Sequence, residues 1–545
     1  MSNAKFNVPS PTNEPINQYK PMSAEKKLLL KELEETRRSF VKVPLVIGGE
    51  KLWKERTNQL LEPHKHSSQI GEYQEAEEKD VLTAIDVSCA AGKVWSRMPW
   101  EERASVFLKA ADLLSTKYRQ KMNAATMLAQ SKTCFQAEID AVCELADFFR
   151  FNARFAQEIY EEQPVHSPFG QWNRTVNRGL EGFIFAVGPF NFTSISLNLA
   201  CAPALMGCSV LWKPAPAAVL SSWVGLQILE EAGLPSGVIN LVTGDPSRIG
   251  EIALNHSSLA GVHFTGSTAT FDYIWGRVGA NISNYRNYPR LVGETGGKDF
   301  IFAHKSASQE ELLVAMLRGA FEYQGQKCSA ASRAYIPQSL WKTLKGPLIE
   351  QVNQIKMGDP TDFTNFMSAV IDKRSFSKIT SYIDHAKVAQ DAKILCGGEY
   401  DDTEGFFVRP TVIETRNPRY RSMVEEIFGP VLTVYVYPDD ELEAVLKLCD
   451  ESTPYALTGA IFARDRSVIE SLSETLRYSA GNFYINDKPT GAVVGQQPFG
   501  GSRRSGTNDK AGSRTNLLKW VTPQTIKENF LSMTNWRYPH MEEGN

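Results

Sequence analysis

Apolar runs that each end at a glycine or proline recur between residues 182 and 268, and helical stretches separate them. The runs are GFIFAVGPFNF (182–192), SVLWKPAPAAV (209–219), VINLVTGD (238–245) and GVHFTGST (261–268). SSWVGLQILEEA, closed by Gly233, is the clearest helix between them. Strands that alternate with helices at this spacing predict a parallel α/β sheet with helices on both faces.

A second alternation begins near residue 300, so we expect two α/β lobes with small extensions. Its strand candidates are DFIFAH (299–304), RAYIP (333–337), VLTVYVY (431–437) and LTGAIFA (457–463). Upstream, residues 24–38 predict an exposed amphipathic helix and residues 102–152 a further helical stretch. The segment from about 513 has little patterning, and we expect it to pair with another subunit.

Composition excludes more than it proposes. A net charge of −3 gives no electrostatic reason to expect nucleic acid or an anionic membrane as a partner. No run approaches the roughly 18 apolar residues of a membrane span. The first residues show neither a secretory signal nor a transit-peptide pattern. The eight cysteines are scattered without a CxxC pair, which argues against a metal site and a disulfide framework, and indicates a reducing compartment. We therefore expect a cytoplasmic protein whose cysteines are mostly small buried hydrophobes.

The helical stretch at 102–152 carries an acidic pattern. Asp140, Glu144 and Asp147 follow one another at spacings of four and three, which puts them on one helix face, with Glu138 off it. The plain interpretation is a solvated acidic stripe.

Four short motifs contain residues suited to chemistry. VGETGGKDF (292–300) places Glu294 before a glycine pair that lets the backbone pass close to another group, and GQKCSAASR (325–333) surrounds Cys328 with small residues. EEIFGPV (425–431) links Glu426 to Phe428, and PFNFT (189–193) places Asn191 just beyond a strand end, where open α/β sheets bind ligands. Taken singly, each has an ordinary interpretation as a buried thiol, a turn residue, an exposed charge or a helix cap.

Taken together and in order, these motifs resemble the aldehyde dehydrogenase superfamily over about residues 90–520. The stretches 482–512, 321–337 and 137–152 resemble its pyrroline-5-carboxylate dehydrogenase family in particular. The resemblance implies an α/β aldehyde dehydrogenase fold with three parts: a Rossmann-like NAD-binding domain (1–163 and 180–292), an α/β catalytic domain (293–500), and a small β oligomerisation flap with a C-terminal segment (164–179 and 513–545).

The resemblance also implies a catalytic mechanism. Cys328 would attack an aldehyde to form a thiohemiacetal, whose oxyanion the Asn191 amide and the Cys328 backbone N–H would hold. Hydride transfer to the nicotinamide leaves a thioester, and Glu294 would act as general base for the water that hydrolyses it. A carboxylate suits that role if partial burial raises its pKa toward neutrality.

The cofactor expected from the resemblance is NAD. No usable GxGxxG follows the first strands. The family pattern instead assigns Lys213 to the adenosine ribose, and Gly266 with Ser267 to the pyrophosphate. It assigns Glu426 to the nicotinamide ribose, with Phe428 packing beside it. Relatives often carry an acidic residue where this chain has Pro216, which leaves the exclusion of NADP open.

The substrate that the resemblance implies is L-glutamate-γ-semialdehyde, formed from Δ1-pyrroline-5-carboxylate. Its carboxylate would meet the Ser329 hydroxyl and the N–H groups of Gly491 and Ala492. Further contacts are assigned as follows: Phe192 and Phe499 flank the aliphatic chain, Glu144 meets the ammonium, and Lys327 favours the Cys328 thiolate or is a surface charge. Some relatives have serine at Ala492, a change that a backbone contact would survive.

Alternative functions remain at this stage. One is an NAD(P)-dependent dehydrogenase of another semialdehyde, a second is a cysteine hydrolase or acyltransferase that uses Cys328 with Glu294, and a third is a non-catalytic protein on the same scaffold. The expected partners are a small-molecule substrate, further copies of the chain in a homodimer or higher oligomer joined through the flap and a partner's C-terminal segment, and a functional link to proline dehydrogenase. A processed eukaryotic chain would lie in the mitochondrial matrix.

Overall fold

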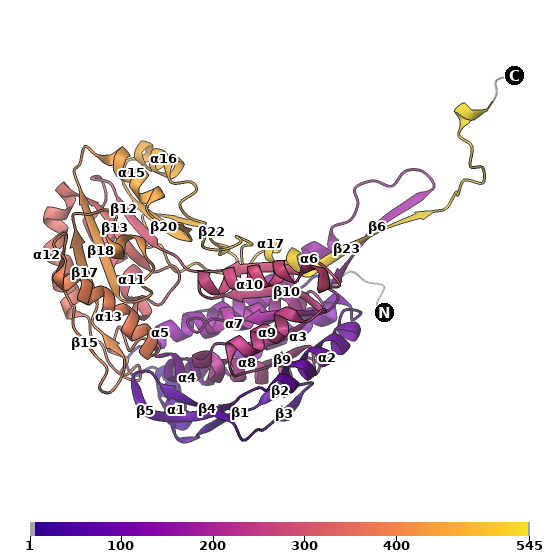
Figure 1. Ribbon diagram of the computed structural model, residues 1–545, viewed down its shortest axis with the longest axis horizontal. Helices are drawn as coiled ribbons and strands as arrows, with labels where there is room; N and C mark the ends of the chain where they lie inside the picture. The colour runs from indigo at the N-terminus through magenta and orange to yellow at the C-terminus, as the bar shows by residue number, and fades with distance from the viewer. Residues whose placement is uncertain (1–5, 543–545) are drawn as a thin grey trace.

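The first lobe is built on a mainly parallel sheet. The computed structural model describes residues 6–542, and this part of the chain contains two seven-stranded sheets (Figure 1). The strand order of the first sheet is β11 (Arg290–Glu294), β10 (Leu259–Thr265), β7 (Phe183–Val187), β8 (Ser209–Lys213), β9 (Ile239–Leu241), β2 (Leu45–Ile47) and β3 (Glu50–Leu52). Strands β11 to β9 are parallel, and β2 is antiparallel to both its neighbours. The four predicted strands of this lobe are confirmed.

Helices cover both faces of this sheet because its central strands are apolar on both sides. In β7, Phe183 and Phe185 pack with α2 (Glu78–Trp95), α9 (Pro246–Asn255) and α10 (Thr268–Ala280). The alternating residues Ile184 and Ala186 pack with helices on the other face, among them α7 (Thr193–Leu205) and α8 (Val219–Ala232). Helix α8 ends at Gly233 in the left-handed conformation, as predicted.

The second lobe repeats this arrangement. Its strand order is β14 (Ala392–Cys396), β17 (Thr411–Thr415), β18 (Val431–Tyr437), β13 (Ala331–Pro337), β12 (Asp299–Ala303), β20 (Thr458–Phe462) and β21 (Asn482–Ile485), with β14 antiparallel. Helices α11 (Gln309–Phe321) and α12 (Gln338–Gln354) cover one face. Helices α13 (Lys373–Val388), α15 (Leu442–Glu451) and α16 (Arg466–Thr475) cover the other. The four predicted strands are confirmed here too.

The predicted helical stretch 102–152 is interrupted. It divides into α3 (Trp100–Ser115), α4 (Arg119–Gln130), α5 (Cys134–Ala137), a π-helical segment (Glu138–Glu144) and α6 (Leu145–Glu161). Ser131 ends α4 in the left-handed conformation, with φ at 52°. The solvated acidic stripe is also wrong, since Asp140 and Asp147 of that face are buried. Upstream, α1 (Ala24–Arg38) matches its predicted range.

A long arm extends away from both lobes (Figure 1). We use "the arm" for residues 162–179 and 521–542, whose strands β6 (Gln171–Gly179) and β23 (Val521–Asn529) form an antiparallel ribbon. Arg174 and Glu528 form an ion pair across it at 2.7 Å. Residues 521–529 thus pair along one edge with β6 of the same chain, and pairing of the C-terminal segment with another subunit stays a prediction.

Smaller elements complete the fold. They are a three-stranded sheet of β1 (Val41–Val43), β5 (Lys65–Gln74) and β4 (Thr57–Glu62), and the pairs β15 (Tyr400–Asp401) with β16 (Phe407–Val408) and β19 (Tyr455–Ala456) with β22 (Ser502–Arg503). Among residues 6–542, no helix has the length and apolarity needed to cross a bilayer.

Candidate active site

Cys328 lies in a sharply turned loop between α11 and β13. Tyr323, Gln324 and Gly325 all have positive φ, so the chain makes a left-handed turn before the cysteine. Non-glycine residues adopt this conformation at a cost, which the surrounding structure must offset. The Gln324 amide does so by donating to the carbonyls of Ser131 and Ala369, at 3.1 and 2.8 Å. The loop is therefore held by buried hydrogen bonds from both lobes.

Asn191 reaches this loop from the end of β7. Its side chain is buried, and Nδ2 donates to the Gln326 carbonyl at 3.0 Å. An asparagine amide has two N–H groups, and this bond uses one of them. The structure thus brings Asn191 beside the backbone that leads into Cys328, although the two residues are far apart in sequence.

Cys328 as a residue is partly exposed, and the pKa of its thiol is strongly perturbed. Burial raises its pKa well above its usual range, and the carboxyls of Asp299, Glu294 and Glu426 raise it further. Lys327 does not offset this effect, because its Nζ is paired with Glu322 at 2.8 Å. Lys327 is itself buried, so its interpretation as a surface charge is wrong.

Glu294 ends β11 with its carboxylate directed to a glycine-rich loop. Its Oε2 accepts a hydrogen bond from the Gly501 backbone at 2.9 Å. Burial raises the pKa of Glu294 to about 8, against the opposing effects of Gly501 and Lys510. A general base at Glu294 was expected to have a pKa raised toward neutrality, and the pKa of this carboxyl is raised in that way.

The glycine pair after Glu294 allows a close approach to two other motifs. A side chain on Gly296 would collide with the Glu426 carboxylate, and one on Gly297 would collide with the Cys328 carbonyl. The Gly297 N–H instead donates to Glu426 Oε1 at 3.0 Å. Three separate stretches of sequence therefore meet here in direct contact.

Cys328 borders two cavities. A small one, of about 10 Å³, is lined by Cys328, Glu426 and Phe428. A larger one, of about 380 Å³, is lined by Cys328 together with every residue assigned to the substrate: Glu144, Phe192, Lys327, Ser329, Gly491, Ala492 and Phe499. The nucleophile candidate thus stands between Glu426 and Phe428, two of the predicted cofactor residues, and the predicted substrate residues.

Three of the residues assigned to the substrate place polar groups at the larger cavity. The Ser329 hydroxyl is hydrogen-bonded to Thr490 at 2.7 Å. Gly491 has a φ of 96°, which favours glycine at this turn. Glu144 accepts a hydrogen bond from Ser194 at 2.6 Å, and burial, with Asp140 nearby, raises its pKa to about 8.

A buried ion pair beneath this cavity was missed from the sequence. Lys132 Nζ lies 2.7 Å from Asp140 Oδ2 and 4.3 Å from the centre of the Phe192 ring. Asp140 also accepts from the backbone N–H groups of Thr193 and Ser194, at 3.0 and 2.9 Å, so it caps α7. The spacing of Asp140 and Glu144 was visible in the sequence, but nothing there marks Lys132.

The residues assigned to a cofactor have a donor set suited to a dinucleotide. Ser267 caps α10, accepting from Thr270 N at 3.2 Å, and a helix N-terminus attracts phosphate. Lys213 is buried at the end of β8, and burial lowers its pKa to about 8. Since β7 lies between β8 and β10, Lys213 and Gly266 leave the sheet at the same edge. Pro216 begins a short 3-10 turn and offers no carboxylate there.

Phe428 belongs to the same region. Its φ is 61°, and its ring packs edge-to-face against Phe190 with centroids 5.8 Å apart. With Glu426 two residues earlier, it presents a carboxylate and an aromatic face to the small cavity at Cys328. These groups fit a ribose and a planar ring.

Comparison with known proteins agrees with this geometry. The sequence pattern of the aldehyde dehydrogenase family matches residues 53–526, and the chain belongs to that family. It is 52% identical over 540 residues to the mitochondrial Delta-1-pyrroline-5-carboxylate dehydrogenase of Dictyostelium discoideum, covering 99% of this chain and 97% of that one. The mouse relative of the same name is 48% identical over 97% of this chain and 94% of its own length.

A solved structure gives the same result for the fold. The Delta-pyrroline-5-carboxylate dehydrogenase from Mycobacterium tuberculosis, bound with NAD, has a TM-score of 0.96 and 50% identity, covering 99% of this chain and 100% of that chain. The expected aldehyde dehydrogenase fold is therefore confirmed.

Proposed function

We propose that the protein oxidises L-glutamate-γ-semialdehyde, formed by hydrolysis of Δ1-pyrroline-5-carboxylate, to L-glutamate in proline breakdown. The observation that carries this proposal is the 380 Å³ cavity, which brings the Cys328 thiol together with the groups expected for the amino-acid end of the substrate. Relatives that bear the Delta-1-pyrroline-5-carboxylate dehydrogenase name support the same substrate.

The substrate would be held by complementary charges and dipoles. The Ser329 hydroxyl and the N–H groups of Gly491 and Ala492 would bind its carboxylate. Glu144 would bind its ammonium, which lowers the cost of ionising a carboxyl whose pKa is about 8. Phe192 and Phe499 would flank the short carbon chain between them.

Cys328 would be the nucleophile. Its sulfur would attack the aldehyde carbon, and the Asn191 amide with the Cys328 N–H would stabilise the resulting oxyanion. Because burial and nearby carboxyls raise the pKa of the thiol, its proton would leave as the C–S bond forms and pass to water in the cavity. Glu294 would then take a proton from the water that hydrolyses the thioester on Cys328.

The cofactor would be NAD, which supplies the hydride acceptor for the oxidation when bound. Lys213 would bind the adenosine ribose, Gly266 and Ser267 at the start of α10 would bind the pyrophosphate, and Glu426 would bind the nicotinamide ribose, with Phe428 beside it. The structure of the M. tuberculosis relative bound with NAD supports this choice. Pro216 leaves the preference over NADP to be measured.

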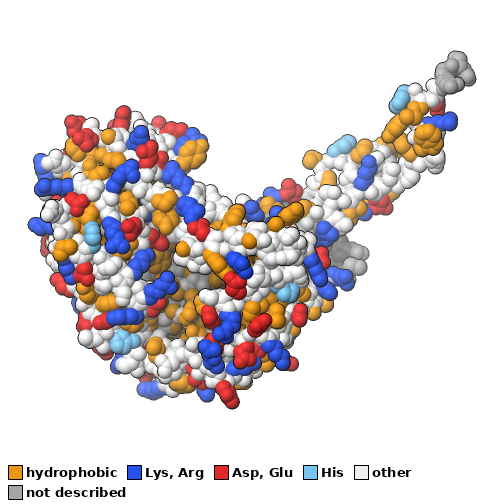
Figure 2. Space-filling view, in the orientation of Figure 1, with side chains coloured by type: hydrophobic (Ala, Val, Ile, Leu, Met, Phe, Trp, Pro, Cys, Tyr) orange, Lys and Arg blue, Asp and Glu red, His pale blue; other side chains and the backbone are white. Residues whose placement is uncertain are grey.

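The protein would work as a homodimer or a higher oligomer joined through its arm. Figure 2 shows hydrophobic side chains gathered on the outer part of the arm. Phe530 and Trp536, which belong to the arm, are 61% and 79% exposed. Such a surface favours contact with another protein. The reaction would follow the one catalysed by proline dehydrogenase, either in the mitochondrial matrix, as the names of the relatives suggest, or in a cytoplasm.

The deciding experiment follows NADH absorbance with Δ1-pyrroline-5-carboxylate, succinate semialdehyde and propanal. We expect a clear preference for Δ1-pyrroline-5-carboxylate, and a loss of at least about a thousandfold in Cys328→Ala. Cys89→Ala, a partly exposed cysteine outside the cavity, is the matched control and should keep wild-type rates. Better turnover of succinate semialdehyde would favour a dehydrogenase of another semialdehyde, and absence of NADH with every aldehyde would favour a cysteine hydrolase.

A further inference from the structure

One wall of the substrate cavity comes from the N-terminal segment. Residues 6–22 have no helix or strand, yet Asn13, Glu14 and Ile16 line the same 380 Å³ cavity as Cys328. We propose that residues 13–16, hereafter the wall segment, determine which aldehydes bind, by limiting the cavity and by fixing the loop 491–496. This inference rests on the proposed function, because that loop is the one assigned to the substrate carboxylate.

Asn13 ties the wall segment to that loop. Its Nδ2 donates to the Val494 carbonyl at 2.8 Å, and its Oδ1 accepts from the Gln496 amide at 3.0 Å. The same Nδ2 donates to Asp147 of α6 at 2.8 Å. One side chain therefore joins three parts of the chain that surround the cavity. Gly491 and Ala492 lie only a few residues before Val494, so Asn13 constrains the position of their N–H groups.

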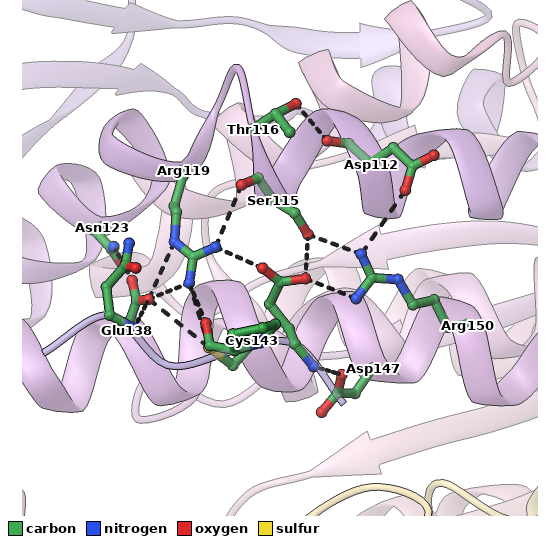
Figure 3. A network of polar contacts seen from close by, with 12 residues as sticks. Asp112, Ser115, Thr116, Arg119, Asn123, Glu138, Cys143, Asp147 and Arg150 are labelled. Atoms are coloured by element: carbon green, nitrogen blue, oxygen red, sulfur yellow. Dashed lines mark hydrogen bonds and ion pairs between the residues drawn. The ribbon is translucent and has the colours of Figure 1, made fainter. Parts of the chain in front are cut away.

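Glu14 anchors the wall segment to the helical layer. Its two carboxylate oxygens accept from Arg119 at 2.6 Å and from Arg150 at 2.7 Å, and its backbone N–H donates to Asp147 at 2.7 Å. Arg119 is held from its other side by Glu138. Figure 3 shows these labelled partners, which extend from α3, α4, the π-helical segment and α6 toward one another.

The charges around Glu14 keep the wall segment attached to the helical layer at neutral pH. Burial alone would raise the pKa of Glu14, but hydrogen bonds from Arg150, Arg119 and Ser115 hold it below its usual range. The carboxylate is therefore ionised and paired at neutral pH. The Asn13 side chain, the Glu14 carboxylate and the Glu14 backbone N–H each make hydrogen bonds of modest net strength, and together they hold residues 13–16.

The test compares Asn13→Ala and Ile16→Ala with Gln18→Ala. Gln18 is an exposed residue of the N-terminal segment 6–22 that lies outside the wall segment and does not line the cavity. In Asn13→Ala we expect the KM for glutamate semialdehyde to rise about tenfold, while kcat for propanal stays within about twofold of wild type. The walls of a cavity exclude substrates with extra methylene groups. The kcat/KM for octanal divided by the kcat/KM for propanal should therefore rise at least about fivefold in Asn13→Ala and Ile16→Ala. Gln18→Ala should match wild type.

The aldehyde series separates this inference from the proposed function. Failure of the wild type to oxidise glutamate semialdehyde would refute the proposed function, while the octanal-to-propanal ratio would still report on the wall. Unchanged ratios in both variants, with an unchanged KM for glutamate semialdehyde, would overturn the inference. If Asn13→Ala does not fold, Ile16→Ala decides, because its side chain is half exposed and carries no hydrogen bond.

Discussion

At the residue scale, Glu294 and Glu144 share a pKa raised to about 8 but have different neighbours. Glu294 accepts from a backbone N–H and faces Lys510, so its ionisation is tuned by fixed groups. Glu144 lies beside Asp140, which raises its pKa, while Ser194 and the buried Lys132 lower it; a bound cation would favour its ionised form further. The first arrangement suits a base, and the second suits recognition of an ammonium.

The pH dependence of turnover follows from Glu294. A general base acts when ionised, so with a pKa of about 8 the steady-state rate should fall about tenfold per pH unit below that value and level off above it. Glu294→Gln should lose turnover by about a hundredfold or more, yet release one equivalent of NADH per active site in a stopped-flow burst, because the thioester still forms. A wild-type pH profile in the variant would contradict this role.

Stability provides the control for that variant. The folded-state pKa of Glu294 is raised above its ordinary value, so ionisation costs folding free energy as pH rises toward 8. A neutral glutamine avoids this cost. The Tm of Glu294→Gln at pH of about 8 or above should therefore equal or exceed that of wild type, which separates a catalytic loss from unfolding.

At the scale of elements, the strands were predictable, and the breaks within the helical stretch 102–152 were not. Apolar runs that end at glycine or proline identify β7, β8, β10 and their counterparts in the second lobe, because burial on both faces leaves a local pattern. The break after α4 depends on Ser131, which adopts a left-handed conformation while its own carbonyl accepts from the Gln324 amide across the lobes. No local pattern encodes such a contact.

The candidate site likewise has one part that could be predicted from the sequence and another that could not. The motifs that carry Cys328, Glu294, Asn191 and Glu426 are local in sequence, and a family resemblance was enough to assign them roles, which remain predictions. Asn13 meets Val494 across 481 residues, and Lys132 meets Asp140 through a buried pair. Both depend on tertiary packing, and an asparagine in a proline-rich segment gives no reason to look for them.

Asp140 should be the residue on which α7 depends. Asp140→Ala would leave Lys132 buried without its partner and the first N–H groups of α7 without an acceptor, which should lower the free energy of unfolding by about 3–5 kcal/mol. Asp112→Ala, an exposed carboxylate of the same lobe, is the control. Thermal unfolding of both variants is the measurement, and equal Tm values would show that the pair is not structurally important.

At the scale of the whole molecule, the arm is the feature that neither lobe needs for its own core. It carries exposed aromatic and aliphatic side chains beyond a ribbon that is regular along nine residue pairs. If subunits join through the arm, as proposed, replacing Phe530 and Trp536 by aspartate should give monomers without changing the fold of the lobes. Val388→Asp, at an exposed position on the second lobe, should leave assembly intact. Light scattering after size-exclusion chromatography measures the mass, and an unchanged mass for the arm variant would refute this role.

The ribbon of the arm also sets an order of events during synthesis. Arg174 leaves the ribosome 354 residues before its partner Glu528, a delay of about 20 to 70 seconds at about 5 to 20 residues per second. Until then β6 has an unpaired edge, while the sheet of the first lobe already has all its strands. A chain that stops early lacks β23 and cannot complete the ribbon. If subunits join through the arm, unfinished chains are therefore kept out of the assembly by the topology itself.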